Sequence, residues 1–261
     1  MDAVLLFSGQ GAQKVGMGKD LYDQYPVAKA LIEQADKALG ESLSAVMFEG
    51  PGEELTRTCN CQPALYVHGL ACLAVLKELV PSLNPVAAAG LSLGEFTAHA
   101  AAGTYSFEEG LRLVQKRGAF MEEACNATKG TMAAMIGGPD ENVIKLAQEC
   151  DVDVANFNCP GQTVVSGTEE GVAKAVAGAK AAGCKIAKKL NVAGAYHSRL
   201  MHSAMVKLAE ELKNISFGTP SMPVYCNYEA RVVEGPDDIR SMLEHQVCGS
   251  VRWTASMQKL V

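Results

Sequence analysis

The sequence predicts an α/β protein in which a small domain is inserted into a larger one. Strands and helices alternate over residues 1–125, a regular β-α-β-β-α-β order follows over 126–194, and helices with one further strand occupy 195–261. Since 48% of the 261 residues are apolar and 20% are charged, the chain can bury a substantial core.

The outer blocks contain ordinary α/β elements. We expect strands at 3–7 (AVLLF), 86–90 (VAAAG) and 222–227, and helices at 19–39, 63–80, about 91–125, 198–214 and beyond. The apolar run 64–76 is too short to span a bilayer, which needs about 20 residues. It therefore predicts a buried helix with Pro63 in its first turn.

The middle block has a more specific order of elements. Strands are expected at 131–138, 152–159, 163–167 and 184–192, with helices at 140–150 and 169–183. This β-α-β-β-α-β order is that of the ferredoxin-like split β-α-β unit.

Charge and cysteine usage argue against several classes of protein. The formal charge of −6 and the pI of about 5.5 argue against nucleic-acid binding, which favours a basic face. The nine cysteines are scattered and no signal-peptide pattern is present, so we expect a reduced, cytoplasmic compartment. Cys59 and Cys61 lack zinc spacing, and we expect no metal site.

The stretch FSGQGAQ at 7–13 follows a strand, as a nucleotide-binding loop would. A dinucleotide fingerprint needs a third glycine where Lys14 stands, and no P-loop G-K-[ST] is present. The remaining interpretation is a turn whose backbone N–H groups bind an anion, including a transient oxyanion.

A second glycine motif, GLSLG at 90–94, lies between a strand and a helix, as a nucleophile elbow requires. Ser92 is then the candidate nucleophile, and the N–H groups of Leu93 and Gln10 are candidate oxyanion donors. The alternative is a serine that only caps the following helix. Of the five histidines, His197 at the end of the inserted block is favoured as the base over His68, His99, His202 and His245.

Seven ordered motifs resemble the malonyl-CoA:acyl-carrier-protein transacylases, the acyltransferase family of fatty-acid and polyketide synthesis. They are FSGQGAQ, QPAL, GLSLGEF, QKRGAFM, NFNCPGQTVVSG, GAYHSRLM and SVRW. The resemblance implies an α/β-hydrolase-like large subdomain, 1–125 and 195–261, with a ferredoxin-like small subdomain, 126–194. The family often has histidine at the position of Leu91, and it continues beyond Val261 with another strand and a G-P-G segment, so the C-terminal part is short here.

The same resemblance assigns roles to individual residues. It implies that Ser92 is the nucleophile, that His197 is its base, and that a backbone carbonyl, that of Gln246, orients the histidine. Arg117 matches the arginine that binds the free carboxylate of malonate. Without the family, a solvated helix arginine is the simpler interpretation of that residue. Gln62 and Asn158 match positions that line the pocket.

The implied partners are malonyl-CoA and an acidic acyl carrier protein that binds transiently to a monomer; no cofactor is expected, because the CoA thioester is the substrate. The basic residues Lys185, Lys188, Lys189 and Arg199 are candidates for the carrier-protein contact, or else an ordinary solvated run. We keep three alternatives open: an acyltransferase of a polyketide pathway, a serine (thio)esterase, and a binding module without catalysis.

Overall fold

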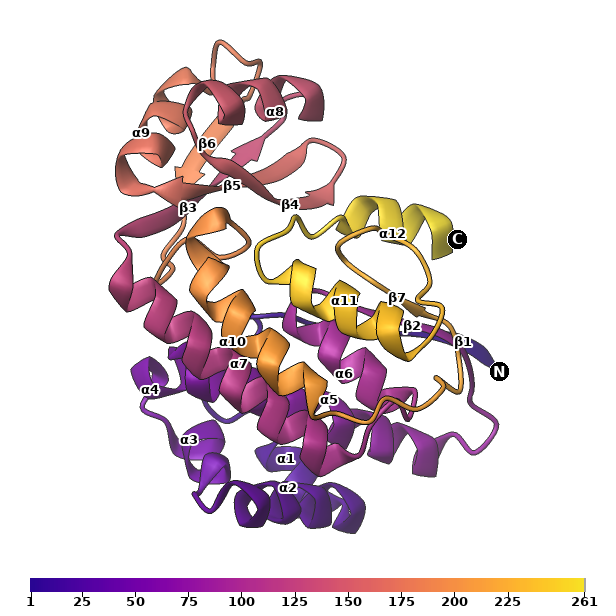
Figure 1. Cartoon of the computed structure of the whole chain (residues 1–261). Coiled ribbons are helices and arrows are strands. Elements are labelled where there is room, and N and C mark those ends of the chain that lie inside the picture. Colours follow the sequence, from indigo (N-terminus) through magenta and orange to yellow (C-terminus); the bar gives the residue numbers. More distant parts are fainter. Residues whose placement is uncertain (261) are drawn as a thin grey trace. The chain divides into compact units, whose positions relative to one another are not determined.

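The computed structural model describes residues 1–260, which form two compact units of a mixed α/β fold (Figure 1). The first unit contains Met1–Ala119, Glu211–Tyr225 and Val232–Ile239. The second contains Phe120–Glu210, Cys226–Arg231 and the chain from Arg240 onward. The expected insertion, 126–194, lies within the second unit. Residues 195–210, which we expected in the larger domain, belong to the second unit as well.

The first unit has a small parallel sheet of order β1-β2-β7. Its strands are β1 (Asp2–Phe7), β2 (Asn84–Gly90) and the short β7 (Val224–Tyr225). Because Phe7 is in register with Gly90, the turns that follow β1 and β2 leave the sheet at the same edge. This edge carries both glycine motifs.

Along residues 1–119, the first unit contains six helices and part of a seventh. They are α1 (Lys19–Gln24), α2 (Pro26–Leu39), α3 (Leu43–Glu49), α4 (Gly52–Thr56), α5 (Thr58–Leu79), α6 (Leu93–Ala101) and the start of α7 (Phe107–Ala127). The helix expected at 19–39 is divided at Tyr25, whose extended backbone allows Pro26 to open α2. The sequence did not predict α3 and α4.

The prediction that Pro63 lies in the first turn of its helix is wrong. Helix α5 begins at Thr58, where the N–H of Cys61 already bonds the Arg57 carbonyl over 2.7 Å, so Pro63 lies inside the helix. Of residues 1–260, α5 alone is long and apolar enough to cross a membrane, and 56% of its apolar window is buried within the structure. Such burial is typical of a core helix.

The helical region expected up to about 125 is divided between α6 and α7. Gly103 adopts φ 74°, and Ser106 then caps α7 reciprocally with Glu109: the Ser106 N–H donates to Oε2, and the Glu109 N–H donates to the Ser106 Oγ. The sequence S-F-E-E contains this capping box, which sequence analysis overlooked.

The second unit contains the expected β-α-β-β-α-β order: β3 (Gly130–Ile136), α8 (Asp140–Glu149), β4 (Asp153–Cys159), β5 (Gln162–Thr168), α9 (Glu169–Gly178) and β6 (Ile186–Lys189). The sheet order is β4-β5-β3-β6 and all neighbouring strands are antiparallel. Helices α8 and α9 pack on one face of this sheet (Figure 1).

The C-terminal elements follow a 3₁₀ turn at Arg199–Met201. They are α10 (His202–Lys213), β7, α11 (Pro236–Gln246) and α12 (Trp253–Leu260). Strand β7 has two residues, fewer than the expected 222–227, and β6 is likewise shorter than the expected 184–192.

A buried histidine makes the first unit sensitive to acid. His99 on α6 is fully buried, and burial lowers its pKa from 6.5 to about 3. Between these values the unfolded chain binds a proton that the folded chain does not, so stability is lost as pH falls below about 6.5. We predict that, between pH 7 and pH 5, the free energy of unfolding falls by about 2 kcal/mol less in His99→Gln than in the parent protein.

Denaturant unfolding at both pH values measures this difference, with His245→Gln, an exposed histidine, as control. Equal pH dependence of His99→Gln and the parent would show that His99 does not couple folding to protonation.

Candidate active site

Ser92 lies on a strained turn between β2 and α6. Its backbone has φ 53° and ψ −105°, a region that residues with a side chain rarely adopt, and it is the N-cap residue of α6. Its side chain is half-buried. A strained strand-to-helix turn is the geometry that presents a nucleophilic hydroxyl at the end of a sheet.

Close backbone contact between the two glycine motifs requires glycine at two positions. A Cβ at Gly94 would overlap the carbonyl oxygen of Phe7, and a Cβ at Gly9 would overlap the carbonyl oxygen of Leu91. The Leu91 N–H also donates to the Phe7 carbonyl over 3.0 Å. The FSGQGAQ turn therefore packs directly against the turn that carries Ser92.

The two candidate oxyanion donors belong to these adjoining turns. Leu93 is the first residue of α6, so its N–H is among those without an intrahelical acceptor. Gln10 is half-buried in the turn after β1, and the neighbouring Gly11 N–H is bound by the Gln13 side chain over 2.7 Å.

Arg117 on α7 is buried beside Ser92, with 1% of its surface exposed. Its Nη2 donates to the Ser92 hydroxyl over 3.1 Å and its Nη1 donates to the side-chain oxygen of Gln62 on α5 over 2.6 Å. Its guanidinium also lies 5.0 Å from the ring centroid of Phe96. The sequence did not predict this contact, although Phe96 is the last residue of the GLSLGEF motif. A solvated helix arginine is therefore excluded.

The Cys61 thiol, close to Gln62 in the first unit, is a poor nucleophile. Cys61, next to Gln62, is fully buried, and burial raises its pKa to about 12, which outweighs the opposing effect of the Gly11 backbone. Because the thiolate is the reactive form of cysteine, Cys61 is a poor candidate for a nucleophile.

His197 belongs to the second unit and is buried, with φ 55°. Its Nδ1 lies 2.9 Å from the carbonyl oxygen of Gln246 and 3.2 Å from that of Gly249. Because carbonyl oxygens only accept hydrogen bonds, Nδ1 carries the proton and Nε2 carries the lone pair. The ring therefore has the tautomer that a general base requires. The Gly249 contact was not foreseen.

The loop that provides these carbonyls is anchored within the second unit. The Ser250 hydroxyl donates to the Val154 carbonyl over 2.6 Å, and the Val251 N–H donates to the Ala155 carbonyl over 2.8 Å. Gly249 is covered by the ring of Tyr228, which a Cβ would overlap. Strand β4 thus fixes the acceptors of His197.

The other histidines have different surroundings. His99 contacts Thr104 and is buried, whereas His202 and His245 are exposed. His68 is half-buried with Cys72 near its ring, and burial lowers its pKa. None of the four has the two carbonyl contacts of His197.

The remaining candidates lie on the second unit. Asn158 on β4 is half-buried and its amide donates to the Gln162 side chain over 3.2 Å. Arg199 pairs with Asp151 and Asp153, and Lys189 lies 3.5 Å from Glu169. Lys185 and Lys188 are exposed and form no ion pair with the residues from 1 to 260.

Ser92, Arg117, Gln62, Gln10 and Leu93 thus belong to the first unit. The other candidates, His197, Gln246 and Asn158, belong to the second.

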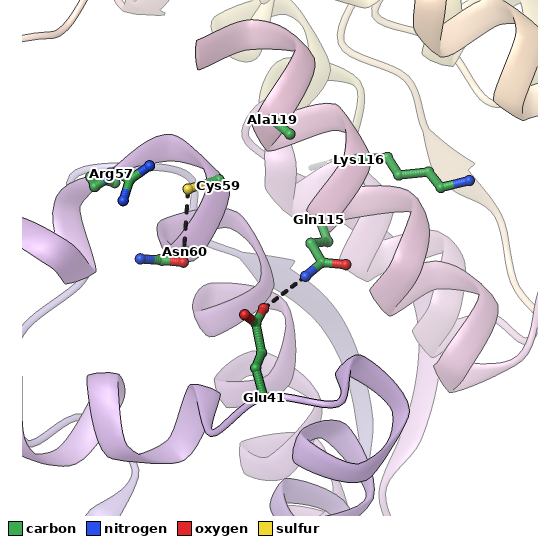
Figure 2. A pocket seen from close by; sticks show the side chains of 7 residues that line it. All are labelled: Glu41, Arg57, Cys59, Asn60, Gln115, Lys116 and Ala119. Carbon is green, nitrogen blue, oxygen red and sulfur yellow. Dashed lines mark hydrogen bonds between the residues drawn. The ribbon is translucent and has the colours of Figure 1, made fainter. Parts of the chain in front are cut away.

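A separate cavity of about 360 Å³ lies in the first unit, between the start of α5 and the middle of α7 (Figure 2). Its cations, Arg57 and Lys116, are paired with Glu54 and Glu211. None of the predicted site residues lines it. In the described part of the chain, no three His, Cys, Asp or Glu side chains are arranged to hold a metal ion.

Comparison with known proteins identifies the family. A family model described as the acyl transferase domain matches residues 4–261. The malonyl CoA-acyl carrier protein transacylase of Bacillus subtilis is 43% identical over 98% of this chain and 82% of its own length.

Two solved structures have the same fold. The malonyl CoA-acyl carrier protein transacylase of Coxiella burnetii is 35% identical, with a TM-score of 0.95 over 98% of this chain and 82% of its own. A malonyl-transacylase in complex with its type II polyketide-synthase acyl-carrier protein is 37% identical, with a TM-score of 0.95 over 98% of this chain and 84% of its own. This chain is therefore a member of the acyl transferase family, an acyltransferase enzyme of the malonyl CoA-acyl carrier protein transacylase group.

Proposed function

We propose that the protein transfers a malonyl group from CoA to the phosphopantetheine thiol of an acyl carrier protein through a malonyl-Ser92 intermediate. The observation that carries this proposal is the buried Arg117, whose guanidinium donates to the hydroxyl of Ser92 on its strained turn. A positive, planar donor fixed beside the nucleophile suits an acyl group that ends in a carboxylate.

The reaction has two matching halves. Nε2 of His197 takes the Ser92 proton while Oγ attacks the thioester carbonyl, and the CoA sulfur then leaves with that proton. In the second half, His197 takes the proton of the carrier thiol, the sulfur attacks the ester carbonyl, and the bond to the Ser92 oxygen breaks as His197 returns the proton to that oxygen. The protonated Nδ1 of His197, held by the Gln246 and Gly249 carbonyls, supports this role.

The backbone around Ser92 supplies the stabilisation of the oxyanion. The N–H groups of Leu93 and Gln10 are assigned as donors, each contributing about 10²–10³ in rate. Support comes from the contact between their turns, in which Gly9 approaches the Leu91 carbonyl. Because both donors are backbone groups, they need no reorganisation when negative charge develops.

Arg117 and Gln62 form the recognition element for the malonyl carboxylate. Gln62 accepts from Nη1 and thereby orients the guanidinium, while Nη2 can exchange the Ser92 hydroxyl for a carboxylate oxygen. We assign Asn158 to the pocket on the strength of the resemblance alone.

The architecture is interpreted in the same way. We assign an α/β-hydrolase-like subdomain to 1–125 and 195–261 and a ferredoxin-like subdomain to 126–194. The parallel β1-β2-β7 sheet with its nucleophile turn supports the first, and the antiparallel order β4-β5-β3-β6 supports the second.

The proposed setting is a monomeric, cytoplasmic enzyme of fatty-acid synthesis that uses no cofactor and meets its carrier protein transiently. Similarity to a transacylase bound to a polyketide-synthase carrier favours a polyketide pathway as the second candidate. The chemistry of the site is the same in both.

Ser92→Ala should abolish the covalent intermediate. After incubation with malonyl-CoA, intact-protein mass spectrometry should show the malonyl adduct on the parent and on Ser82→Ala, a control in an exposed loop, but not on Ser92→Ala. Persistent labelling of Ser92→Ala would assign the nucleophile elsewhere. Release of malonate to water, without transfer to carrier protein, would identify a thioesterase.

Arg117→Lys should impair the transfer of malonyl groups more than that of acetyl groups, because lysine keeps the positive charge but lacks the planar guanidinium that can donate two parallel hydrogen bonds to a carboxylate. We expect malonyl transfer to fall about tenfold to hundredfold, equivalent to the ~1.5–3 kcal/mol of a charged hydrogen bond. Acetyl loading should fall much less. Arg112→Lys, on the exposed face of α7, is the control. Equal losses with both acyl groups would contradict carboxylate recognition.

The carrier-protein contact is assigned to Lys185 and Lys188, since Lys189 and Arg199 are paired with carboxylates within their own unit. Reversing both charges, Lys185→Glu with Lys188→Glu, should raise the KM for carrier protein about threefold to tenfold at low salt, with the difference shrinking as salt screens it. Lys37→Glu with Lys77→Glu, on exposed positions of the first unit, makes the same change in net charge. An unchanged KM would locate the contact elsewhere.

A further inference from the structure

The backbone of His197 is strained. Among residues 1–260, four residues other than glycine have positive φ: Ser92, Asp151, His197 and Ala230. A left-handed backbone of this kind costs about 1–3 kcal/mol and persists only when the surroundings fix it. The hydrogen bonds of the imidazole hold the ring, but a further device must hold the main chain.

The hydroxyl of Ser198 bridges the chain across His197. Ser198 is fully buried, and its Oγ donates to the Ala195 carbonyl over 2.6 Å and accepts from the Leu200 N–H over 3.2 Å. One partner precedes His197 and the other follows it. The hydroxyl therefore closes a loop that contains the strained residue.

Both ends of this bridge are attached to the antiparallel sheet. Ala195 packs on β3 at Gly130, where an added Cβ would lie 2.6 Å from the Ala195 Cβ. On the other side, the N–H of Arg199 donates to Asp153 on β4 over 2.8 Å, and the Arg199 guanidinium pairs with the same carboxylate. Arg199 thus has a structural role next to the bridge.

We propose that Ser198 is a positioning residue for the acyl transfer, since its hydroxyl holds His197 in the left-handed conformation in which Nδ1 meets the Gln246 and Gly249 carbonyls. The inference rests on the proposed role of His197 as base. Removing the hydroxyl leaves the Ala195 carbonyl and the Leu200 N–H without this partner and lets the backbone of His197 relax. The ring is then misplaced, while substrate binding by Arg117 is unaffected.

Ser198→Ala tests this, with Ser166→Ala as the matched control. Ser166 is also fully buried in the second unit, but its hydroxyl has no hydrogen-bond partner among the described residues. Initial rates of malonyl transfer give kcat and KM. Proton NMR follows the hydrogen-bonded Nδ1 proton of His197, assigned by its loss in His197→Gln. Thermal unfolding reports whether each variant is folded.

We expect Ser198→Ala to lower kcat about tenfold, a part of the ~10²–10⁴ that a general base contributes, with KM for malonyl-CoA within about twofold of the parent. Its Nδ1 proton should exchange faster with water. Ser166→Ala should match the parent in all three measurements.

The inference is overturned if Ser198→Ala keeps the parent kcat, if KM rises as kcat falls, or if the Nδ1 signal is unchanged. Failure of the proposed function has a different signature. In that case His197→Gln itself would form and transfer the malonyl adduct at the parent rate.

Discussion

Direct contact between two backbone turns is the constraint on which the first unit's part of the site depends. The parallel register of β1 and β2 brings both turns to one edge of the sheet, and the absence of side chains at Gly9 and Gly94 lets them touch. Ser92 is forced into its strained conformation by this packing, at a cost of about 1–3 kcal/mol. The same packing brings the candidate oxyanion donors, Gln10 and Leu93, onto adjoining turns.

The same logic applies to the second unit. His197 is a strained residue whose ring is held by backbone carbonyls, and those carbonyls are anchored to β4 through Ser250 and Val251. No carboxylate is required to select the tautomer, because a carbonyl can only accept the Nδ1 proton. In the proposed mechanism, the candidate base and the candidate oxyanion donors are thus held or provided by main-chain atoms, which lose little conformational freedom when the substrate binds.

Motifs that specify backbone geometry could be interpreted from the sequence, whereas the burial of an individual charged side chain could not. GLSLG and FSGQGAQ predict tight turns, and the rule for parallel strands brings them to one edge of a sheet. Arg117 lies in a helix with an ordinary charged pattern, and its burial depends on α5 and α6 covering it. The start of α5 differs from the prediction because proline, although it favours a first helical turn, here lies one turn further along a helix that begins at Thr58. The Gly249 carbonyl, like any main-chain acceptor, has no sequence signature.

The choice of nucleophile illustrates why geometry outweighs intrinsic reactivity here. A thiol is the stronger nucleophile, and the chain has nine cysteines, one of which, Cys61, lies near enough to the FSGQGAQ turn for the Gly11 backbone to affect its pKa. Burial keeps that thiol protonated, with a pKa of about 12, so its intrinsic advantage is lost. Ser92, the proposed nucleophile, is instead half-buried on its strained turn, where its hydroxyl accepts a hydrogen bond from the Arg117 guanidinium. Under the proposed mechanism, reactivity at this edge of the sheet is therefore assigned by the fold, since burial silences the thiol of Cys61, which is intrinsically the more reactive group.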